Sequence, residues 1–545
     1  MIELKRAAVL AAALALSLGT LTACGSDDSG GTTGEMGETG AMADYAVGTT
    51  FKATEPLTFS LMYRDHPNYP YKADWLFLEK LASDQNVSFE ITNVPLSDWN
   101  TQKPILIASG DAPDIIPVTY TSEQAQYAAG GAILPISDYL EYMPNYKDKV
   151  EKWGLQTAID SIVQSDGKYY VLPGLHEEPR FQYSIAIRDD LWKAAGITED
   201  PKTWDEFKAD LVKIKNANLP GVKYPMSDRW KMGSLLSQAA PSFGTKSGAT
   251  STNTWGFDNG IYYDTAKGEF VYAGAQEEQK ELLKFFASLV KEGLMDPDSL
   301  SQDDDQAKAK ITTGQSTAIA TNDQVIVTDY RQPMEELGEG GSVRMIRLPA
   351  GPKGDIVNVS RLESGLMVSA KAAEKPYFKA LLQFIDWLYY SDEGLKFAKW
   401  GVEGVTYTGT GDDLKLASDV DYNGANPSGT KQLNKDFGFS NGVWMPANGS
   451  VFALEKAMLN DDGKAFVEVM KDKTLQEPDP AAPMDEETQA TASTYQTQLT
   501  DIVIQNTVEF ISGAKDIDKD WDAYISALKA AGLDEYVKLY NDAKK

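Results

Sequence analysis

The stretch DGKYYVLPGLHEEPRFQYSIAIRDDLWKAAGITEDPKTWDEF, residues 166–207, decides how the chain divides. Its centre, 181–188, alternates polar and apolar side chains and then becomes apolar, which predicts a strand that is buried along only part of its length. A short helix is expected at 189–195, with Gly196 as its C-cap residue. A second helix starts at 203–206, TWDE, where the Thr hydroxyl and the Glu carboxylate form a capping box. We interpret the stretch as a strand that leaves one lobe and enters another.

Length and composition predict a chain with more than one core and an acidic surface. A chain of 545 residues is too long for a single core. Its 80 Asp and Glu against 51 Lys and Arg give a net charge of −29, which argues against nucleic acid, since phosphate binding needs a basic surface. A strand, a helix and a strand at 57–62, 75–83 and 87–91 predict a parallel sheet, whose ligands bind beyond the carboxyl ends of the strands.

The first 23 residues have the features of a secretory signal, with Lys5 and Arg6 before an apolar run. The run is shorter than the ~20 residues that a membrane span needs, although a single-pass helix is the alternative. The motif LTAC resembles the bacterial lipoprotein signal with cleavage before Cys24, the only cysteine. A diacylglycerol there would hold the chain on a membrane. Residues 24–48, rich in Gly, Ser, Thr and acidic residues, are predicted to form a flexible tether.

The sequence motifs, taken in order, resemble those of a known family. DGKYYVLP, RDDLW and TWDEF, with ASGDAPD, FIDWLYYSDEG and GVEGVTY elsewhere, resemble the extracellular solute-binding proteins of bacterial ABC importers, specifically the maltose-binding-protein-like group of large oligosaccharide binders. The resemblance implies an α/β fold of two lobes, of periplasmic-binding-protein type II, with mixed sheets flanked by helices and a hinge of three crossover segments. The expected first lobe comprises 49–178 and 320–363, and the expected second lobe 179–319 and 364–545.

Candidate ligand-binding residues follow from how proteins recognise sugars. Aromatic rings pack under sugar C–H groups, and carboxylates, amides and arginines pair the hydroxyls. Four tryptophans stand in loops rich in Gly, Asn, Ser and Asp, and the resemblance places two of them, Trp400 and Trp444, as stacking platforms. Polar groups near the hinge are also candidates, with surface salt links as the alternative for those at 177–180. The expected ligand-binding residues are Arg64, Asp65, His66, Tyr69, Thr119, Tyr120, Glu177, Glu178, Arg180, Trp230, Trp255, Asn322, Asp323, Glu363, Trp400, Glu403, Tyr407 and Trp444.

No metal, cofactor or catalytic motif is expected. His66 and His176 are the only histidines, and HEEPR at 176–180 is not HExxH. DVDYNG at 419–424 opens like a calcium loop, but Thr430 stands where a bidentate Glu is needed. The sequence has no GxSxG and no P-loop. We therefore predict a monomeric oligosaccharide-binding lipoprotein that serves ABC permease subunits and is not an enzyme; a glycoside hydrolase and a binder of another solute, such as a peptide, are the alternatives.

Overall fold

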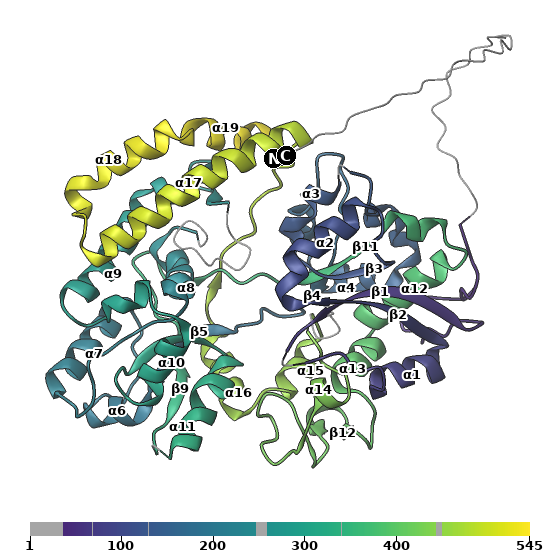
Figure 1. Cartoon of the computed structure of the whole chain (residues 1–545), viewed down its shortest axis with the longest axis horizontal. Coiled ribbons are helices and arrows are strands. Elements are labelled where there is room, and N and C mark those ends of the chain that lie inside the picture. Colours follow the sequence, from purple (N-terminus) through teal and green to yellow (C-terminus); the bar gives the residue numbers. More distant parts are fainter. Residues whose placement is uncertain are drawn as a thin grey trace, which may run out of the picture. The chain divides into compact units, whose positions relative to one another are not determined.

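The structure is a computed structural model that describes residues 36–67, 69–128, 130–246, 259–338, 340–442 and 449–544. Cys24, Trp255 and Trp444 lie outside these residues, as does the predicted signal sequence. Gly37–Lys545 forms one compact unit, which contains all the helices and strands described below (Figure 1). Within the described ranges, no helix is both long enough and apolar enough to cross a membrane.

The first lobe is built on a five-stranded sheet in the order β2-β1-β3-β11-β4. β1 runs parallel to β2 and β3, and β11 runs antiparallel to β3 and β4. The strand–helix–strand opening and its parallel pairing are thus confirmed. The elements of this lobe are β1 (Leu57–Asp65), α1 (Leu76–Gln85), β2 (Val87–Pro95), α2 (Trp99–Ala108), β3 (Ile115–Thr119), α3 (Ala125–Ala128), α4 (Pro144–Lys152), α5 (Gln156–Asp160), β4 (Leu172–Leu175), β11 (Leu362–Val368), α12 (Phe378–Tyr390) and α13 (Asp392–Trp400).

Helix α12 covers the first sheet through aromatic contacts. The ring of Phe384 lies 5.4 Å from that of Phe59 on β1 and 5.8 Å from that of Phe89 on β2. Ser391 ends α12, and its hydroxyl accepts a hydrogen bond from the Gly394 N–H at 2.9 Å, which caps α13.

The second lobe is built on an antiparallel sheet in the order β8-β5-β9. Helices α17, α18 and α19 form its carboxyl-terminal part, and α17 packs on α9 (Figure 1). The elements of this lobe are β5 (Tyr183–Arg188), α6 (Asp189–Ala194), α7 (Trp204–Ala217), α8 (Gly233–Phe243), β6 (Ile261–Asp264), β7 (Glu269–Tyr272), α9 (Glu277–Lys291), α10 (Asp304–Thr312), β8 (Ala318–Asn322), α11 (Gln332–Leu337), β9 (Val343–Ile346), α16 (Asp461–Met470), α17 (Glu486–Ser512), α18 (Ile517–Ala530) and α19 (Leu533–Ala543).

Short strand pairs and helical turns complete the described chain. The remaining strands and α-helices are β10 (Ile356–Val357), β12 (Tyr407–Thr408), β13 (Lys415–Leu416), β14 (Val420–Asp421), β15 (Lys431–Gln432), β16 (Thr474–Leu475), α14 (Leu433–Asp436) and α15 (Phe452–Ala457). The short turns are η1 (Leu96–Asp98), η2 (Thr121–Glu123), η3 (Ile136–Tyr142), η4 (Trp230–Met232), η5 (Ala273–Ala275), η6 (Pro297–Leu300), η7 (Ile326–Arg331), η8 (Ala370–Glu374) and η9 (Gly411–Asp413).

The elements predicted in the opening stretch are present as β5, α6 and α7. Gly196, just beyond α6, has the positive φ of +82° that a helix-ending glycine provides. The Thr203 hydroxyl accepts from the Glu206 N–H at 3.1 Å, as a capping residue does. The reciprocal bond differs from the prediction, because the Glu206 carboxylate accepts from the N–H of Lys202 at 2.7 Å.

Three crossover segments join the lobes and lie side by side. The first, 176–182, connects β4 to β5; the second, 347–361, connects β9 to β11; the third, 449–460, leads from the first lobe to α16. The His176 N–H donates to the Arg361 carbonyl at 3.0 Å, and the Glu177 N–H donates to the Ser450 carbonyl at 3.1 Å. The first crossover is therefore held between the other two.

Two predicted lobe boundaries need correction. Residues 320–363 were expected in the first lobe, but β8 and β9 pair with β5 in the second sheet. Residues 364–545 were expected in the second lobe, but α12 and α13 belong to the first. Strand β8 follows α10 directly and stays within the second lobe.

The predicted tether also extends too far. The N-terminal arm, residues 37–48, is hydrogen-bonded to α12. The Met42 N–H donates to the side-chain oxygen of Gln383 at 2.9 Å, and the Tyr45 hydroxyl donates to Asp386 at 2.8 Å. Composition missed this docking because the arm is held by backbone groups and one aromatic hydroxyl rather than by an apolar run.

Candidate functional site

Polar and aromatic side chains gather at one edge of the first sheet. β1 and β3 are parallel, so their carboxyl ends meet at this edge, and antiparallel β11 begins there. Tyr69 lies in the loop after β1, Tyr120 follows β3, and Glu363 is the second residue of β11. Tyr120 is 41% exposed although it is aromatic. The edge thus offers hydroxyls, rings and a carboxylate.

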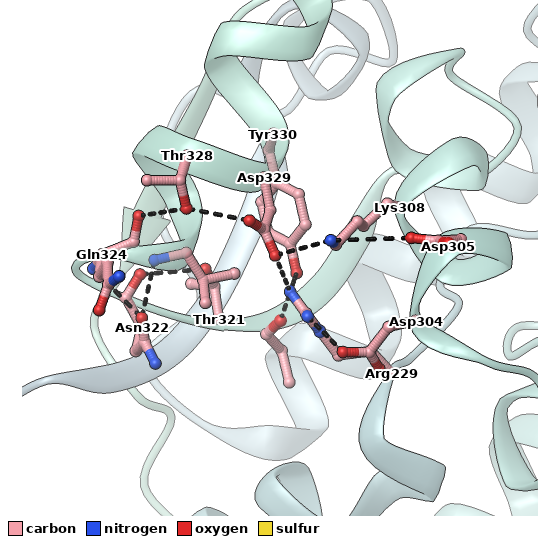
Figure 2. Close-up of polar contacts among 12 residues, drawn as sticks. Arg229, Asp304, Asp305, Lys308, Thr321, Asn322, Gln324, Thr328, Asp329 and Tyr330 are labelled. Atoms are coloured by element: carbon pink, nitrogen blue, oxygen red, sulfur yellow. Dashed lines mark hydrogen bonds and ion pairs between the residues drawn. The ribbon is translucent and has the colours of Figure 1, made fainter. Parts of the chain in front are cut away.

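The second lobe presents a matching edge. Tyr183 begins β5 and pairs with Asn322, the last residue of β8. The Asn322 side-chain oxygen accepts from the N–H groups of Gln324 and Val325 at 3.1 and 2.8 Å, which fixes the turn after β8 (Figure 2). This turn carries Asp323 and Gln324 beyond the end of the strand.

The two edges touch each other. The Gln324 side-chain amide donates to the Tyr69 hydroxyl at 3.1 Å, and Arg180 on the first crossover pairs with Asp323 at 3.4 Å. Burial raises the pKa of the Tyr183 hydroxyl to about 12, and the nearby carboxylates of Asp323 and Glu363 add to it. We define the junction site as these convergent residues: Tyr69, Tyr120, Arg180, Tyr183, Asn322, Asp323, Gln324 and Glu363.

Trp230 stands in a strained loop of the second lobe. Trp230, Lys231 and Met232 have consecutive positive φ angles of 52°, 52° and 65°. Positive φ at non-glycine residues costs about 1–3 kcal/mol each, and such strain concentrates at functional sites. The guanidinium carbon of Arg229 lies 4.2 Å from the Trp230 ring centroid. The loop therefore holds this ring against an arginine.

Arg229 is itself fixed by a network of polar contacts, which Figure 2 shows. Its guanidinium pairs with Asp304 at 2.6 Å and with Asp329 at 3.1 Å, and it donates to the Tyr330 hydroxyl at 3.3 Å. The Arg229 side chain is 4% exposed. A buried arginine with three partners cannot move easily, so the Trp230 ring rests on a rigid support.

The first lobe carries a comparable strained residue. Val118, near the end of β3, has a φ of 51°, which is an outlier for a β-branched side chain. The register between β3 and β11 shifts here, and the Val118 carbonyl accepts from buried Lys103 at 3.1 Å. The chain then turns outward into Tyr120. Each lobe thus has strained backbone beside candidate ligand-binding residues.

The structure buries two of the predicted ligand contacts, and the third stays a prediction. Thr119 is fully buried, and its hydroxyl donates to the Ile116 carbonyl at 3.3 Å. Trp400 is also fully buried and packs against Tyr407, with 6.1 Å between ring centroids. Trp400 is the last residue of α13, so the glycine that follows ends a helix rather than marking a binding loop. Glu403 is exposed in the turn beside Tyr407, apart from the junction site.

Arg64 and Asp65 at the end of β1, and His66 just after it, differ in what their side chains contact. Asp65 accepts from the Tyr71 N–H at 3.1 Å and from Asn93 at 2.8 Å, so it shapes the loop. The His66 ring lies 5.2 Å from that of Tyr69. Arg64 is half-buried, and burial lowers its pKa. These residues support or flank Tyr69.

The predicted residues of the first crossover also differ in position and contacts. The Glu177 carboxylate accepts from the Phe452 N–H at 2.8 Å and so joins the first and third crossovers. Glu178 is exposed. Arg180 belongs to the junction site, where Asp323 and Glu455 keep its pKa above the usual range although burial opposes this.

Sequence reasoning missed several residues of this region. Gln324 follows the predicted Asp323 in sequence, and Tyr183 pairs with the predicted Asn322 across the sheet. The ends of β5 and β8 therefore held a usable signal. Lys399 and Glu455 had none, because they come from α13 and α15 and meet the first crossover only through the fold.

The described residues form hollows at the crossovers and beside β9. The first, of about 70 Å³, lies at the crossovers and is lined in part by Arg180, Asp323 and Tyr422. It has room for about two waters and is smaller than the ~300–1,000 Å³ of ordinary ligand pockets. The second, of about 710 Å³, lies beside Arg344 at the opposite end of β9 from the junction site.

The calcium-like loop at 419–424 uses its carboxylates internally. Asp421 accepts from the N–H groups of Gly424 and Asn426 at 3.2 and 2.9 Å, and Asp419 pairs with Lys431 at 2.9 Å. In the described part of the chain, no three His, Cys, Asp or Glu residues are grouped so as to hold a metal ion.

Solved structures with a similar fold were found. One is an HMO-binding, ABC-transporter-associated solute-binding protein from Bifidobacterium longum infantis, with 20% identity over 90% of this chain and 100% of that one, and a TM-score of 0.67. Another is an alginate-binding protein without calcium, with 19% identity over 91% and 99% and a TM-score of 0.66. A third is an ABC-transporter substrate-binding protein of S. pneumoniae in complex with kestose, with 18% identity over 89% and 98% and a TM-score of 0.60.

The comparison of sequences gives the family. A search of curated proteins found no match. Residues 68–394, more than half of the chain, match the family described as bacterial extracellular solute-binding proteins, and the solved structures share the two-lobed α/β fold. This chain belongs to the bacterial extracellular solute-binding protein family.

Proposed function

We propose that this chain captures an oligosaccharide between its two lobes and delivers it to the transmembrane subunits of an ABC importer. The observation that carries the proposal is the junction site, where both lobes supply aromatic rings together with hydroxyl, amide, carboxylate and guanidinium groups. Solved structures of similar fold are described as binding alginate, HMO or kestose.

The chemistry of the junction site suits a sugar. A saccharide hydroxyl both donates and accepts, and leaving it unpaired on burial costs about 1–3 kcal/mol. Asp323 and Glu363 can accept from such hydroxyls, and the amide of Asn322 can do both. The ring of Trp230 supplies an apolar surface for the C–H face. The proposed ligand-binding residues are Arg64, Tyr69, Tyr120, Arg180, Tyr183, Trp230, Asn322, Asp323, Gln324 and Glu363, together with Trp255 and Trp444 outside the described residues.

Capture requires the lobes to move. The direct contact between Gln324 and Tyr69 occupies groups that a solute needs, so the sugar must replace it with contacts to each partner. A closed form is then favoured only when a solute bridges the two edges, which is how a ligand shifts a hinge equilibrium.

A hydrolytic role has less support. Burial raises the pKa of Asp228 to about 7 and that of Asp386 to about 6, in the range of a general acid. Both carboxyl groups are fully buried, however, and so out of reach of a glycosidic bond. We propose that the bound sugar is released unaltered.

The proposed location is the outer face of the cell membrane, with a diacylglycerol on Cys24 as the anchor. Mass spectrometry of the mature chain tests this proposal. The expected result is a chain that begins at a lipid-modified Cys24, and Cys24→Ser is expected to move the protein from the membrane fraction to the medium. An unmodified chain beginning elsewhere would overturn the anchor.

A thermal-shift screen of the chain from Gly37 tests the solute class, since the N-terminal arm belongs to the folded lobe. The panel contains neutral, fructose-based and uronic-acid oligosaccharides. A ligand at about 100 times its dissociation constant stabilises the protein by about 2.7 kcal/mol, so a cognate sugar is expected to raise the melting temperature and to be recovered intact. A shortened sugar would indicate a hydrolase, and no hit would reject the sugar assignment.

The proposed monomeric state is tested in the same preparation. Light scattering is expected to give the mass of a single chain with and without the hit sugar. A doubled mass would contradict it.

A further inference from the structure

Six ionisable side chains form one group where the crossovers meet; those of His176 and Lys399 are buried, and the other four are partly buried. We call this group the hinge cluster. His176 and Arg180 come from the first crossover, Glu363 from the start of β11 after the second, and Glu455 from the third. Lys399 comes from α13 in the first lobe, and Asp323 follows β8 in the second lobe. Any rotation of one lobe against the other therefore changes distances inside the cluster.

His176 is at the centre of this group. Its side chain is fully buried. One ring nitrogen, Nδ1, lies 3.0 Å from Glu455 on the third crossover, and the other, Nε2, lies 3.7 Å from Glu363 at the start of β11. The backbone of His176 also bonds to that of Arg361. One imidazole thus faces a carboxylate on each side, and each carboxylate belongs to a different connection.

The other members complete two arms of the cluster. Lys399, with its side chain 5% exposed, lies 3.8 Å from Glu455. Arg180 pairs with Asp323 at 3.4 Å and so reaches the second lobe. The other ionisable groups around His176 are Glu177 on its own segment, Arg361 on the second crossover and Tyr422 of the first lobe, which interacts with Arg180.

The charges balance only if His176 carries a proton. Asp323, Glu363 and Glu455 contribute three negative charges, and Arg180 and Lys399 contribute two positive charges. A buried charge without a counter-charge is costly. An imidazolium at His176 supplies the missing positive charge, and it can pair with both carboxylates that face it.

We propose that His176 is a positioning residue that, as an imidazolium, clamps the three crossovers together, so that losing its proton loosens the hinge and weakens solute capture. His176 and Glu363 are held at the ends of the paired strands β4 and β11, whereas Glu455 lies on the third crossover. A hinge movement that shifts the third crossover changes the separation of His176 from Glu455, so protonation and lobe movement are thermodynamically linked. This role of His176 does not depend on which solute the protein binds.

The direction of the effect follows from the surroundings. Burial alone would lower the pKa of His176, but Glu455 and Glu363 outweigh it and leave the pKa above its usual value. A histidine with a raised pKa stabilises the folded form fully below about pH 6.5, its value in the unfolded chain, and this contribution is lost as pH rises through the raised pKa. Burial lowers the pKa of Lys399 to about 8, so the loss of charge from Lys399 has to be measured separately from that of His176.

Imidazole NMR resolves the histidine directly. The chain has two histidines, so His66→Gln leaves the ring signal of His176 alone. Its midpoint is expected above pH 6.5, whereas that of His66, whose pKa is lowered mainly by burial, is expected below it in His176→Gln. A His176 midpoint at or below 6.5 would overturn the proposal. The measurement of the His176 midpoint needs no substitution in the hinge cluster.

Spin-label distances report the hinge itself. In a Cys24→Ser chain without other cysteines, Ser83→Cys on α1 and Asn216→Cys on α7 place one exposed label on each lobe. The distance distribution is expected to be narrow at pH 6 and to widen at least twofold as His176 deprotonates. His176→Gln is expected to be wide at every pH, with His66→Gln as the matched control behaving like the parent. The difference between parent and His176→Gln excludes the contribution of Lys399.

The outcomes separate this proposal from the sugar assignment, since no ligand is added. Identical distributions for parent and His176→Gln at every pH would overturn the clamp, even if a sugar binds. Conversely, a failed sugar screen leaves the clamp standing when the ring titration and the distances behave as expected.

Discussion

At the residue scale, Glu455 has the most demanding position in the hinge cluster. It lies 3.0 Å from His176 and 3.8 Å from Lys399, and these cations lower its pKa to about 2 although burial opposes this. Removing one partner of a buried ion pair costs about 3–5 kcal/mol, because the other charge stays buried without compensation.

We therefore expect Glu455→Gln to lower the free energy of unfolding by about 3 kcal/mol, measured by urea denaturation at pH 7. Glu468→Gln is the matched control, because Glu468 forms an exposed pair with Lys471 on α16 and such pairs contribute little. Equal effects of the two substitutions would show that the hinge cluster does not stabilise the fold.

Trp400 and Trp230 are expected to respond in opposite ways. Trp400 is fully buried, so Trp400→Ala should lower the free energy of unfolding by about 3–5 kcal/mol and leave the solute affinity of the folded protein unchanged. Trp230→Ala should weaken solute binding with less effect on stability. Urea denaturation and calorimetric titration check both properties, and a loss of affinity in fully folded Trp400→Ala would restore Trp400 as a ligand contact.

At the element scale, local signals predicted several helices and strands but not their connections. Capping and periodicity located α7 and β5, since these depend on neighbouring residues. The assignment of β8 to its sheet depends on pairing with β5, which is distant in sequence. Trp400 was misplaced for a local reason, because a glycine after a buried helix end has the same sequence appearance as one in a binding loop.

The N-terminal arm provides a test at this scale. The Tyr45 hydroxyl donates to Asp386 at 2.8 Å, and Asp386 also accepts from the Asn145 side chain at 2.7 Å. A hydrogen bond to a charged group contributes about 1.5–3 kcal/mol, so Tyr45→Phe should lower the free energy of unfolding by about 2 kcal/mol in urea denaturation. Thr49→Ala, which removes a surface contact to the Ala46 N–H, is the control. If Tyr45→Phe behaves like Thr49→Ala, the arm is not docked.

At the scale of the whole molecule, the two-lobed architecture brings together residues that no local pattern joins. The rule that ligands bind beyond the carboxyl ends of strands pointed from sequence to the loop that carries Tyr69. The hinge cluster could not be found in this way, because His176, Glu363 and Glu455 become neighbours only when three separate crossovers lie side by side.

Calorimetric titration of one sugar from the screen into three chains tests most directly whether the solute is held between the lobes. The parent chain is compared with Tyr120→Ala in the first lobe and Trp230→Ala in the second. We predict that the parent binds the sugar and returns it intact, and that each substitution weakens binding at least tenfold, or about 1.4 kcal/mol. Full affinity in either variant, with the protein folded, would contradict capture by both lobes.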